Sequence, residues 1–303
     1  MTLKIHVIPE KNLYFSEPNP FSFGNPDNPP VQPPFWSAEN WLQTRFHFSF
    51  AEYDNPSNET FGVLRVMNDD LVQPERGFAT HAHRDMEIIT YVVSGELTHE
   101  DTMGNAETLR RGSVQYMTAG TGVEHSEHNR SEDTPMRCIQ TWILPKEYGL
   151  KPNYGSYSNP GGIKVGDSAW ENTLKHLTSS VDNKAEDIVA PARINQDVDC
   201  YAAELELGAQ VLLELPKGRM AYMLCIEGAV SVASESMTSS TSPVCSGQHF
   251  DVQKHDGCEI TGTGGAISIT ATETESTENG DLAHVLLFTM ATAPNAGRSD
   301  LHK

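Results

Sequence analysis

Short β-rich runs are the feature that most constrains the fold of this 303-residue chain. Residues 45–50 (RFHFSF) alternate aromatic and polar side chains, and residues 88–93 (IITYVV) and 138–144 (CIQTWIL) are rich in β-branched and aromatic residues. Glycine, asparagine and aspartate separate these runs, and no long amphipathic pattern with a period of 3.6 competes with them. Short strands separated by polar turns predict an all-β fold, either a sandwich or a barrel.

Composition and charge exclude several classes of protein. The content of 38% hydrophobic and 20% charged residues is typical of a globular protein, and no apolar run approaches the ~20 residues of a membrane helix. The net charge of −20 opposes direct binding to a nucleic-acid backbone. We therefore expect neither a nucleic-acid nor a membrane partner. Residues 1–9 are typical of an edge strand rather than a signal peptide, which predicts a cytoplasmic location, or a nuclear one in a eukaryote.

The cysteines favour packing over disulfide chemistry. Their number, 5, is odd, and no two of them form a C-x-x-C motif. We therefore expect buried, unpaired thiols in reducing surroundings. The five residues are Cys138, Cys200, Cys225, Cys245 and Cys258.

A weak internal repeat predicts two tandem domains. Residues 91–97 (YVVSGEL) resemble residues 224–230 (LCIEGAV), because in each a strand enters a glycine turn and a second strand leaves it. Residues 149–165 are rich in proline, glycine, serine and asparagine, as a linker would be. The sequence therefore predicts two β-barrel domains, at residues 1–155 and 156–303.

Two short motifs in the N-terminal half carry metal-binding residue types. His81 and His83 lie two residues apart, as do His125 and Glu127, and a small residue separates each pair. Residues two apart in a strand point to the same face, so four ligands converge if the two strands are neighbours. Either motif alone is weak evidence, but both together predict one divalent metal ion, since three imidazoles and a carboxylate suit a first-row metal.

The residues around these motifs resemble a known family. Residues 77–87 (GFATHAHRDME) resemble the first motif of the cupins. Residues 112–127 (GSVQYMTAGTGVEHSE) resemble the second motif, with two extra residues before the histidine and the ending H-S-E. That ending, together with residues 84–92, 99–101 and 117–122, closely resembles the pirin family, and the resemblance extends from about Arg45 to Tyr154.

The resemblance implies a fold and a metal site. Pirins are bicupins, with two tandem jelly-roll β-barrels, and their metal, usually iron, lies in the N-terminal barrel. Carried over motif by motif, the ligands are His81, His83, His125 and Glu127. Fe(II) is the expected ion, although the donor set would also accept Mn, Co, Ni, Cu or Zn.

Two further expectations concern carboxylates and the second domain. Ordinary cupins use the glutamate of their first motif, here Glu87, which we rank behind Glu127 as a neighbouring or substitute ligand. In the C-terminal half, the positions aligned with His81 and His125 carry Glu214 and Ile260. Domain 156–303 is therefore expected to be a degenerate cupin without metal.

The resemblance also implies an activity. Members of the pirin family are described as quercetin 2,3-dioxygenases, which open a flavonol with O2. Glu127 would then be both a metal ligand and the catalytic general base. Phe78, Tyr116 and Met117 are candidates for the pocket wall, whereas His99 is expected to face a turn without a role in the site.

The resemblance also allows a second function. Eukaryotic pirins are co-regulators whose metal oxidation state alters the binding of a partner. The chain could therefore be a redox-responsive metal protein that binds another protein without turnover. Uptake of oxygen with a flavonol distinguishes the two hypotheses.

Overall fold

The computed structural model describes residues 3–26, 41–158, 171–183, 190–235, 248–277 and 280–292. Within these ranges the chain is almost entirely β-structure, with only two 3-10 helices, η1 (Glu10–Asn12) and η2 (Pro20–Phe23), and no helix there could span a membrane. The chain divides into two compact units. We call them the N-terminal unit (within residues 14–162 and 194–196) and the C-terminal unit (within residues 1–13, 163–193 and 197–296).

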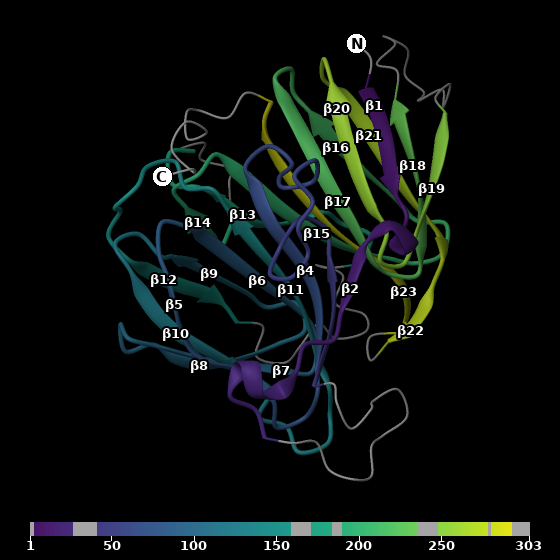
Figure 1. The fold of residues 1–303 in the computed structure, drawn as a ribbon. Helices are drawn as coiled ribbons and strands as arrows, with labels where there is room; N and C mark the ends of the chain where they lie inside the picture. The colour runs from purple at the N-terminus through teal and green to yellow at the C-terminus, as the bar shows by residue number, and fades with distance from the viewer. Residues whose placement is uncertain are drawn as a thin grey trace. The chain divides into compact units, whose positions relative to one another are not determined.

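The N-terminal unit consists of two antiparallel sheets (Figure 1). The seven-stranded sheet contains, in spatial order, β12 (Asn153–Tyr157), β9 (Val114–Thr118), β6 (Glu87–Ser94), β11 (Met136–Ile143), β4 (Leu64–Val72), β3 (Leu42–Phe46) and β2 (Tyr14–Ser16). The four-stranded sheet contains β5 (Gly77–His83), β10 (Val123–His128), β7 (Glu96–Asp101) and β8 (Ala106–Arg110).

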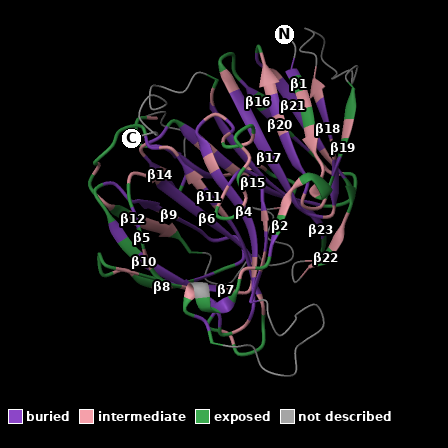
Figure 2. Ribbon diagram, in the orientation of Figure 1, coloured by how far each residue is buried: buried purple, intermediate pink, exposed green. Residues whose placement is uncertain are grey.

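Apolar side chains from both sheets form one core. Val92 of β6, Leu97 of β7 and Leu109 of β8 are each at most 1% exposed and belong to the same cluster. Strand β3 alternates buried and half-buried residues, as expected of a strand with one face on a core. Because the cluster joins strands of both sheets, the two sheets pack face to face, and the most buried positions follow their central strands (Figure 2).

The C-terminal unit repeats this arrangement. Its larger sheet contains β1 (Leu3–Ile8), β20 (Gly257–Gly262), β17 (Arg219–Glu227), β23 (Gly280–Ala291), β15 (Val198–Leu205), β13 (Lys175–Ser180) and β14 (Ala192–Ile194), with β22 (Glu275–Thr277) paired to β23. Its smaller sheet contains β16 (Gln210–Leu215), β21 (Gly265–Glu273), β18 (Ala229–Glu235) and β19 (His249–Gln253). The all-β prediction is confirmed.

The first strand has an unexpected partner. The sequence predicted an edge strand at residues 1–9, and β1 is indeed the outer strand of its sheet. It pairs with β20, from Leu3 opposite Gly262 to Ile8 opposite Gly257, and so lies in the C-terminal unit. The proposed boundary near residue 155 stays a prediction, but residues 3–13 belong to the C-terminal unit and not to the domain to which that boundary assigned them.

The internal repeat is visible at two glycine turns. Gly95 joins β6 to β7 with a φ of 71°, and Gly228 joins β17 to β18 with a φ of 67°. A Cβ atom would lie 2.5 Å from the Pro135 carbonyl oxygen at Gly95 and 2.4 Å from that of Glu273 at Gly228. Only glycine fits both the backbone conformation and the close approach, which explains why the two segments share this residue.

The described cysteines behave as packing residues. They are all buried and none of them forms a disulfide, whereas Cys245 lies outside the described residues. Burial raises the pKa of the Cys138 and Cys200 thiols well above the usual range, so both are protonated at neutral pH. The buried cysteines without a disulfide in these ranges are Cys138, Cys200, Cys225 and Cys258.

Candidate metal centre

Strands β5 and β10 bring three histidines together. His81 and His83 share one face of β5, and His125 of β10 lies directly opposite His81 in the antiparallel register. Each ring offers a nitrogen within 4.8 Å of the other two, and the ring centroids lie 4.6 to 4.8 Å apart. Three of the four predicted ligands therefore lie together in this structure.

The three rings fit the demands of a metal ion. Nε2 of His125 lies 3.2 Å from Nε2 of His81, close to the ~3.0 Å that separates two ligands bound at right angles at ~2.1 Å from an ion. Burial first, and then the neighbouring rings, lower the pKa of both His83 and His125 to about 3. Both rings are therefore neutral, which is the form that binds metals.

Neighbouring groups orient the rings. Nδ1 of His81 lies 2.8 Å from the Ala79 carbonyl oxygen, so it can donate there and leave Nε2 as the acceptor. The His83 ring meets the edge of Trp142 at a centroid distance of 4.8 Å and an interplanar angle of 83°. The cluster is thus held in place by its surroundings before any ion binds.

Glu127 lies beside the histidines but in a second group. A register shift between His125 and Glu127 interrupts the pairing with β5. The Glu127 carboxylate is 2% exposed and accepts hydrogen bonds from Thr90 (3.3 Å), Gln115 (2.6 Å) and Gln140 (2.6 Å). It offers an oxygen to a group with His125 and not to the group of three histidines. The four-ligand assignment therefore stays a prediction.

Glu87 is occupied elsewhere. Its buried carboxylate accepts hydrogen bonds from Thr118 (2.9 Å) and from the backbone and side chain of Asn195 (3.1 and 2.9 Å). Burial raises its pKa. Among the described residues, Glu87 joins neither metal-competent group, so its role as a substitute ligand has no support in this geometry.

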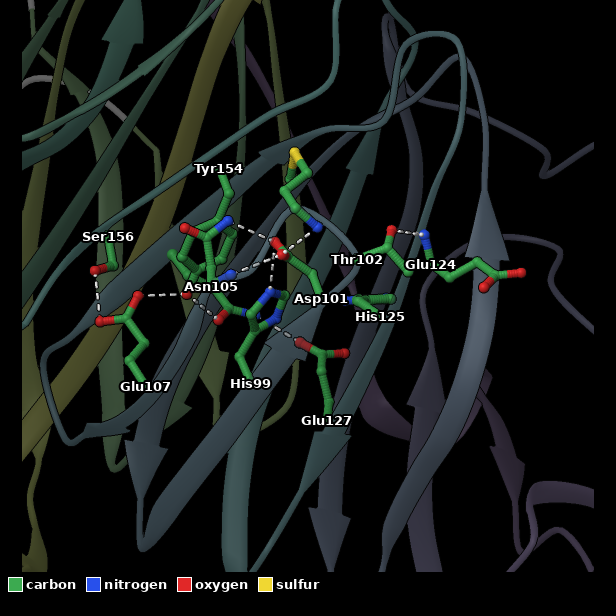
Figure 3. A network of polar contacts seen from close by, with 12 residues as sticks. His99, Asp101, Thr102, Asn105, Glu107, Glu124, His125, Glu127, Tyr154 and Ser156 are labelled. Carbon is green, nitrogen blue, oxygen red and sulfur yellow. Dashed lines mark hydrogen bonds and ion pairs between the residues drawn. The ribbon is translucent and has the colours of Figure 1, made fainter.

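His99 is the residue that the sequence reasoning missed. It does not face a turn: it lies in β7 directly opposite Glu127 of β10, and it is 0% exposed. Its ring stacks on Tyr154 at 4.2 Å and 14° (Figure 3). The signal was present, because His99 and Asp101 have the same spacing of two residues as the other motifs.

A polar network supports the Glu127 carboxylate (Figure 3). Gln115, which donates to Glu127, accepts a hydrogen bond from the Tyr154 hydroxyl at 3.1 Å. The same hydroxyl hydrogen is shared with Glu107, which also accepts a hydrogen bond from Ser156 at 2.8 Å. Burial, and then Glu107, raise the pKa of Tyr154, so its hydroxyl keeps its proton and remains a donor.

An aromatic cavity of about 180 Å³ opens beside the histidines. His81 and His83 border it, and so does Phe78, as the sequence analysis expected. Tyr116 and Met117 are not among its lining residues. The aromatic walls are Phe23, Phe46, Phe50, Phe78 and Trp142.

Asp70 of β4 is a buried acid in the wall of this cavity. It is 2% exposed, and this burial is the main cause that raises its pKa to about 7, although the neighbouring Thr44 hydroxyl acts in the opposite direction. No sequence pattern pointed to it, because its position depends on how β4 packs against the other sheet.

Asp70 should make stability depend on pH. A carboxyl with a raised pKa in the folded state stabilises the fold below its unfolded pKa, 3.8, and loses that contribution as the pH rises to about 7. We expect Asp70→Asn to remove this part of the pH dependence, measured as unfolding free energy of the metal-free protein from pH 4 to pH 8. If the curves for the variant and the wild type stay parallel across this range, Asp70 is not the source of the pH dependence.

Comparisons with known proteins identify the family. The Pirin family profile matches residues 31–143, and a profile described as the quercetinase C-terminal cupin domain matches residues 182–290. The chain is 39% identical over 192 residues to the "Pirin-like protein" of Caulobacter vibrioides, covering 63% of this chain and 78% of that one. It is 35% identical over 194 residues to the "Quercetin 2,3-dioxygenase" of Escherichia coli K12, covering 63% and 77%.

Solved structures agree with these matches. The Escherichia coli protein YhhW matches with a TM-score of 0.70 and 27% identity over 97% of this chain and 100% of that one. A second structure, titled as the bacterial pirin YhhW in complex with nickel(II), gives a TM-score of 0.69 and 27% identity over 95% and 99%. The chain therefore belongs to the pirin family, and its two β units are the tandem cupin domains of a bicupin.

Proposed function

We propose that this protein is a metal-dependent dioxygenase that opens a flavonol such as quercetin with O2. The observation that carries the proposal is the three-histidine cluster at the edge of an aromatic cavity, His81 and His83 being common to both. The name quercetin 2,3-dioxygenase, borne by the Escherichia coli relative, supports the substrate class. A bound ion would supply a Lewis acid and an electron carrier for the substrate and O2.

The cavity can hold and orient part of a flavonol. Its volume, about 180 Å³, is below the ~300 Å³ at the lower end of small-molecule pockets. One ring system would therefore lie between the aromatic side chains, where offset or edge-on contacts with Phe50 and Trp142 stabilise it. The rest of the molecule would extend beyond the cavity.

Glu127 is our first candidate for the proton acceptor of the flavonol hydroxyl. It is buried next to His125, but it does not line the cavity. Gln140, which does, donates to it at 2.6 Å. Access to Glu127 therefore requires Gln140 to release that hydrogen bond. Asp70 lines the cavity directly, and its pKa of about 7 makes it the alternative acceptor.

An oxygen-uptake assay tests the proposal. Protein loaded anaerobically with Fe(II) should consume oxygen when quercetin is added, in step with a fall in flavonol absorbance. The metal-free protein is the control. If no first-row metal supports turnover of any flavonol tested, while a metal binds and changes the affinity for a protein partner, the function is that of a redox-responsive binding protein.

The metal assignment has its own test. We expect His83→Ala and His125→Ala each to lose most of the metal, because each removes an imidazole from a cluster of three. Metal content after dialysis measures this, and circular dichroism shows whether the β-fold is retained. The His176→Ala variant is a matched control, since His176 is engaged with Asp199 at 3.0 Å in the C-terminal unit. Full metal content in both cluster variants would refute the assignment.

A further inference from the structure

The aromatic cavity has a polar stretch in its wall. Thr44 of β3 and both Asn68 and Asp70 of β4 line it. Thr44 lies directly opposite Asp70 in the antiparallel pairing of β3 with β4, and Asn68 lies two residues before Asp70, on the same face of the strand. These three side chains, which we call the polar wall, therefore lie side by side on one face of the sheet. Each is at most 4% exposed.

Two atoms of the polar wall have no hydrogen-bond partner. They are Oγ1 of Thr44 and Oδ1 of Asn68, and both are buried. The Thr44 hydroxyl is close enough to Asp70 to affect the pKa of that carboxyl, but it makes no hydrogen bond to it. Burying an unpaired polar atom destabilises a fold, so such atoms are rare and each needs an explanation. In the wall of a cavity, a hydrogen bond to a ligand provides one.

The buried polar groups elsewhere in the cavity lining are already engaged, apart from the two histidines. Ser16 donates to Glu52. Gln140 donates to Glu127 at 2.6 Å and accepts a hydrogen bond from Trp142 at 3.0 Å. Among the described lining residues, unused and buried hydrogen-bonding capacity therefore lies at the polar wall.

The remaining walls suit an aromatic ring of the substrate. Phe46, Phe50 and Trp142 line the cavity, and such side chains favour offset or edge-on contacts with a planar ring. A flavonol consists of a fused ring pair, which carries the 3-hydroxyl, and a smaller pendant phenyl ring bonded to the neighbouring carbon. Because His81 and His83 border the same cavity, a 3-hydroxyl directed at them leaves the pendant ring inside the cavity.

We propose that the polar wall binds the hydroxyl groups of this pendant ring, and that it makes the site selective for flavonols whose pendant ring is a catechol. A phenolic hydroxyl donates to Oδ1 of Asn68, and the adjacent hydroxyl pairs with the hydroxyl of Thr44, which can donate or accept. Two adjacent hydroxyls on the ring thus match two buried oxygens in the wall. The inference rests on the proposed dioxygenase function and identifies residues that determine its specificity.

Binding of two matched flavonols tests the inference without turnover. Quercetin and galangin differ only in the two hydroxyls of the pendant ring, which galangin lacks. Protein loaded with redox-inert Zn(II) should bind quercetin roughly 30-fold more tightly than galangin, the combined effect of two neutral hydrogen bonds. Quenching of tryptophan fluorescence measures both affinities, since Trp142 lines the cavity.

Variants of the polar wall should remove this difference selectively. Asn68→Leu and Thr44→Val, which keep the size of each side chain, should each weaken quercetin binding by roughly 5-fold, the effect of one neutral hydrogen bond, and leave galangin binding unchanged. Thr44→Ser, which retains the hydroxyl, should bind quercetin like the wild type. Asn68→Ala is available should leucine disturb the fold, and it should lose the same discrimination.

Thr141→Val is the matched control. Thr141 is also a buried threonine whose Oγ1 has no hydrogen-bond partner, but it does not line the cavity. Its replacement should leave the affinities for quercetin and galangin as they are in the wild type. A loss of quercetin affinity in this variant equal to that in Thr44→Val would show a general effect on the fold.

Equal affinity of the wild-type protein for the two flavonols, including no binding of either, would overturn the inference and leave the polar wall with no role beyond binding water. Equal losses for both flavonols in Asn68→Leu would overturn it as well, because a purely structural effect does not distinguish the ligands. The inference and the proposed function fail separately. Selective binding without oxygen uptake keeps the subsite and removes the dioxygenase, whereas oxygen uptake without selectivity does the reverse.

Discussion

Glu127→Gln is expected to lower the turnover of quercetin by roughly 10² to 10⁴-fold, the usual effect of losing a general base. Glutamine keeps a side-chain oxygen beside His125 but cannot accept the proton of the flavonol hydroxyl. The metal content should fall less than the rate, because the group of three histidines does not include Glu127. Steady-state oxygen uptake and metal analysis of the same sample measure the two effects separately.

Two further variants show whether the loss of turnover is specific to Glu127. Glu87→Gln is the matched control, since Glu87 is also a buried glutamate but is engaged by Thr118 and Asn195 rather than by the histidines. It should keep its metal. Asp70→Asn tests the alternative base: turnover that survives in Glu127→Gln and disappears in Asp70→Asn would transfer the role to Asp70.

The sequence was most informative where chemistry follows strand parity. His81 and His83 share a face because side chains alternate along a strand, and a single pairing of β5 with β10 then adds His125. The turns at Gly95 and Gly228 could also be predicted from the sequence. Only glycine adopts the positive φ found there and leaves room for the neighbouring carbonyl oxygen.

The pairing of strands that are far apart in the chain could not be predicted from the sequence. His99 lies at the site because β7 pairs with β10. Glu127 lies outside the group of three histidines, and the pairing of β10 with β5 is irregular between His125 and Glu127. Asp70 was hidden for a similar reason, since its burial depends on the packing of two sheets. The pairing of β1 with β20 joins residues more than 240 positions apart in the chain, and no local pattern encodes such a choice.

A buried ion pair next to the cavity wall should be important for stability. Arg137 of β11 donates from Nε to Oδ1 of Asp69 at 2.8 Å and from Nη2 to Oδ2 at 2.7 Å. The side chains are 9% and 2% exposed, respectively. Two parallel hydrogen bonds between opposite charges in low-dielectric surroundings make this a strong, well-oriented contact. Asp69 is also one of the charges that raise the pKa of the neighbouring Asp70.

Arg137→Met is expected to lower the unfolding free energy by about 3 to 5 kcal/mol, the range observed when one partner of a buried pair is removed. Most of that loss comes from leaving the Asp69 carboxylate buried without its bidentate donor, rather than from losing the attraction itself. Urea unfolding of the metal-free protein at pH 7 measures the change. The double variant Asp69→Leu/Arg137→Met should recover most of it, because neither charge is then buried, and it should also lower the pKa of Asp70. If the double variant is as unstable as the single one, the loss of unfolding free energy comes from lost packing of the arginine side chain and not from the unpaired Asp69 carboxylate.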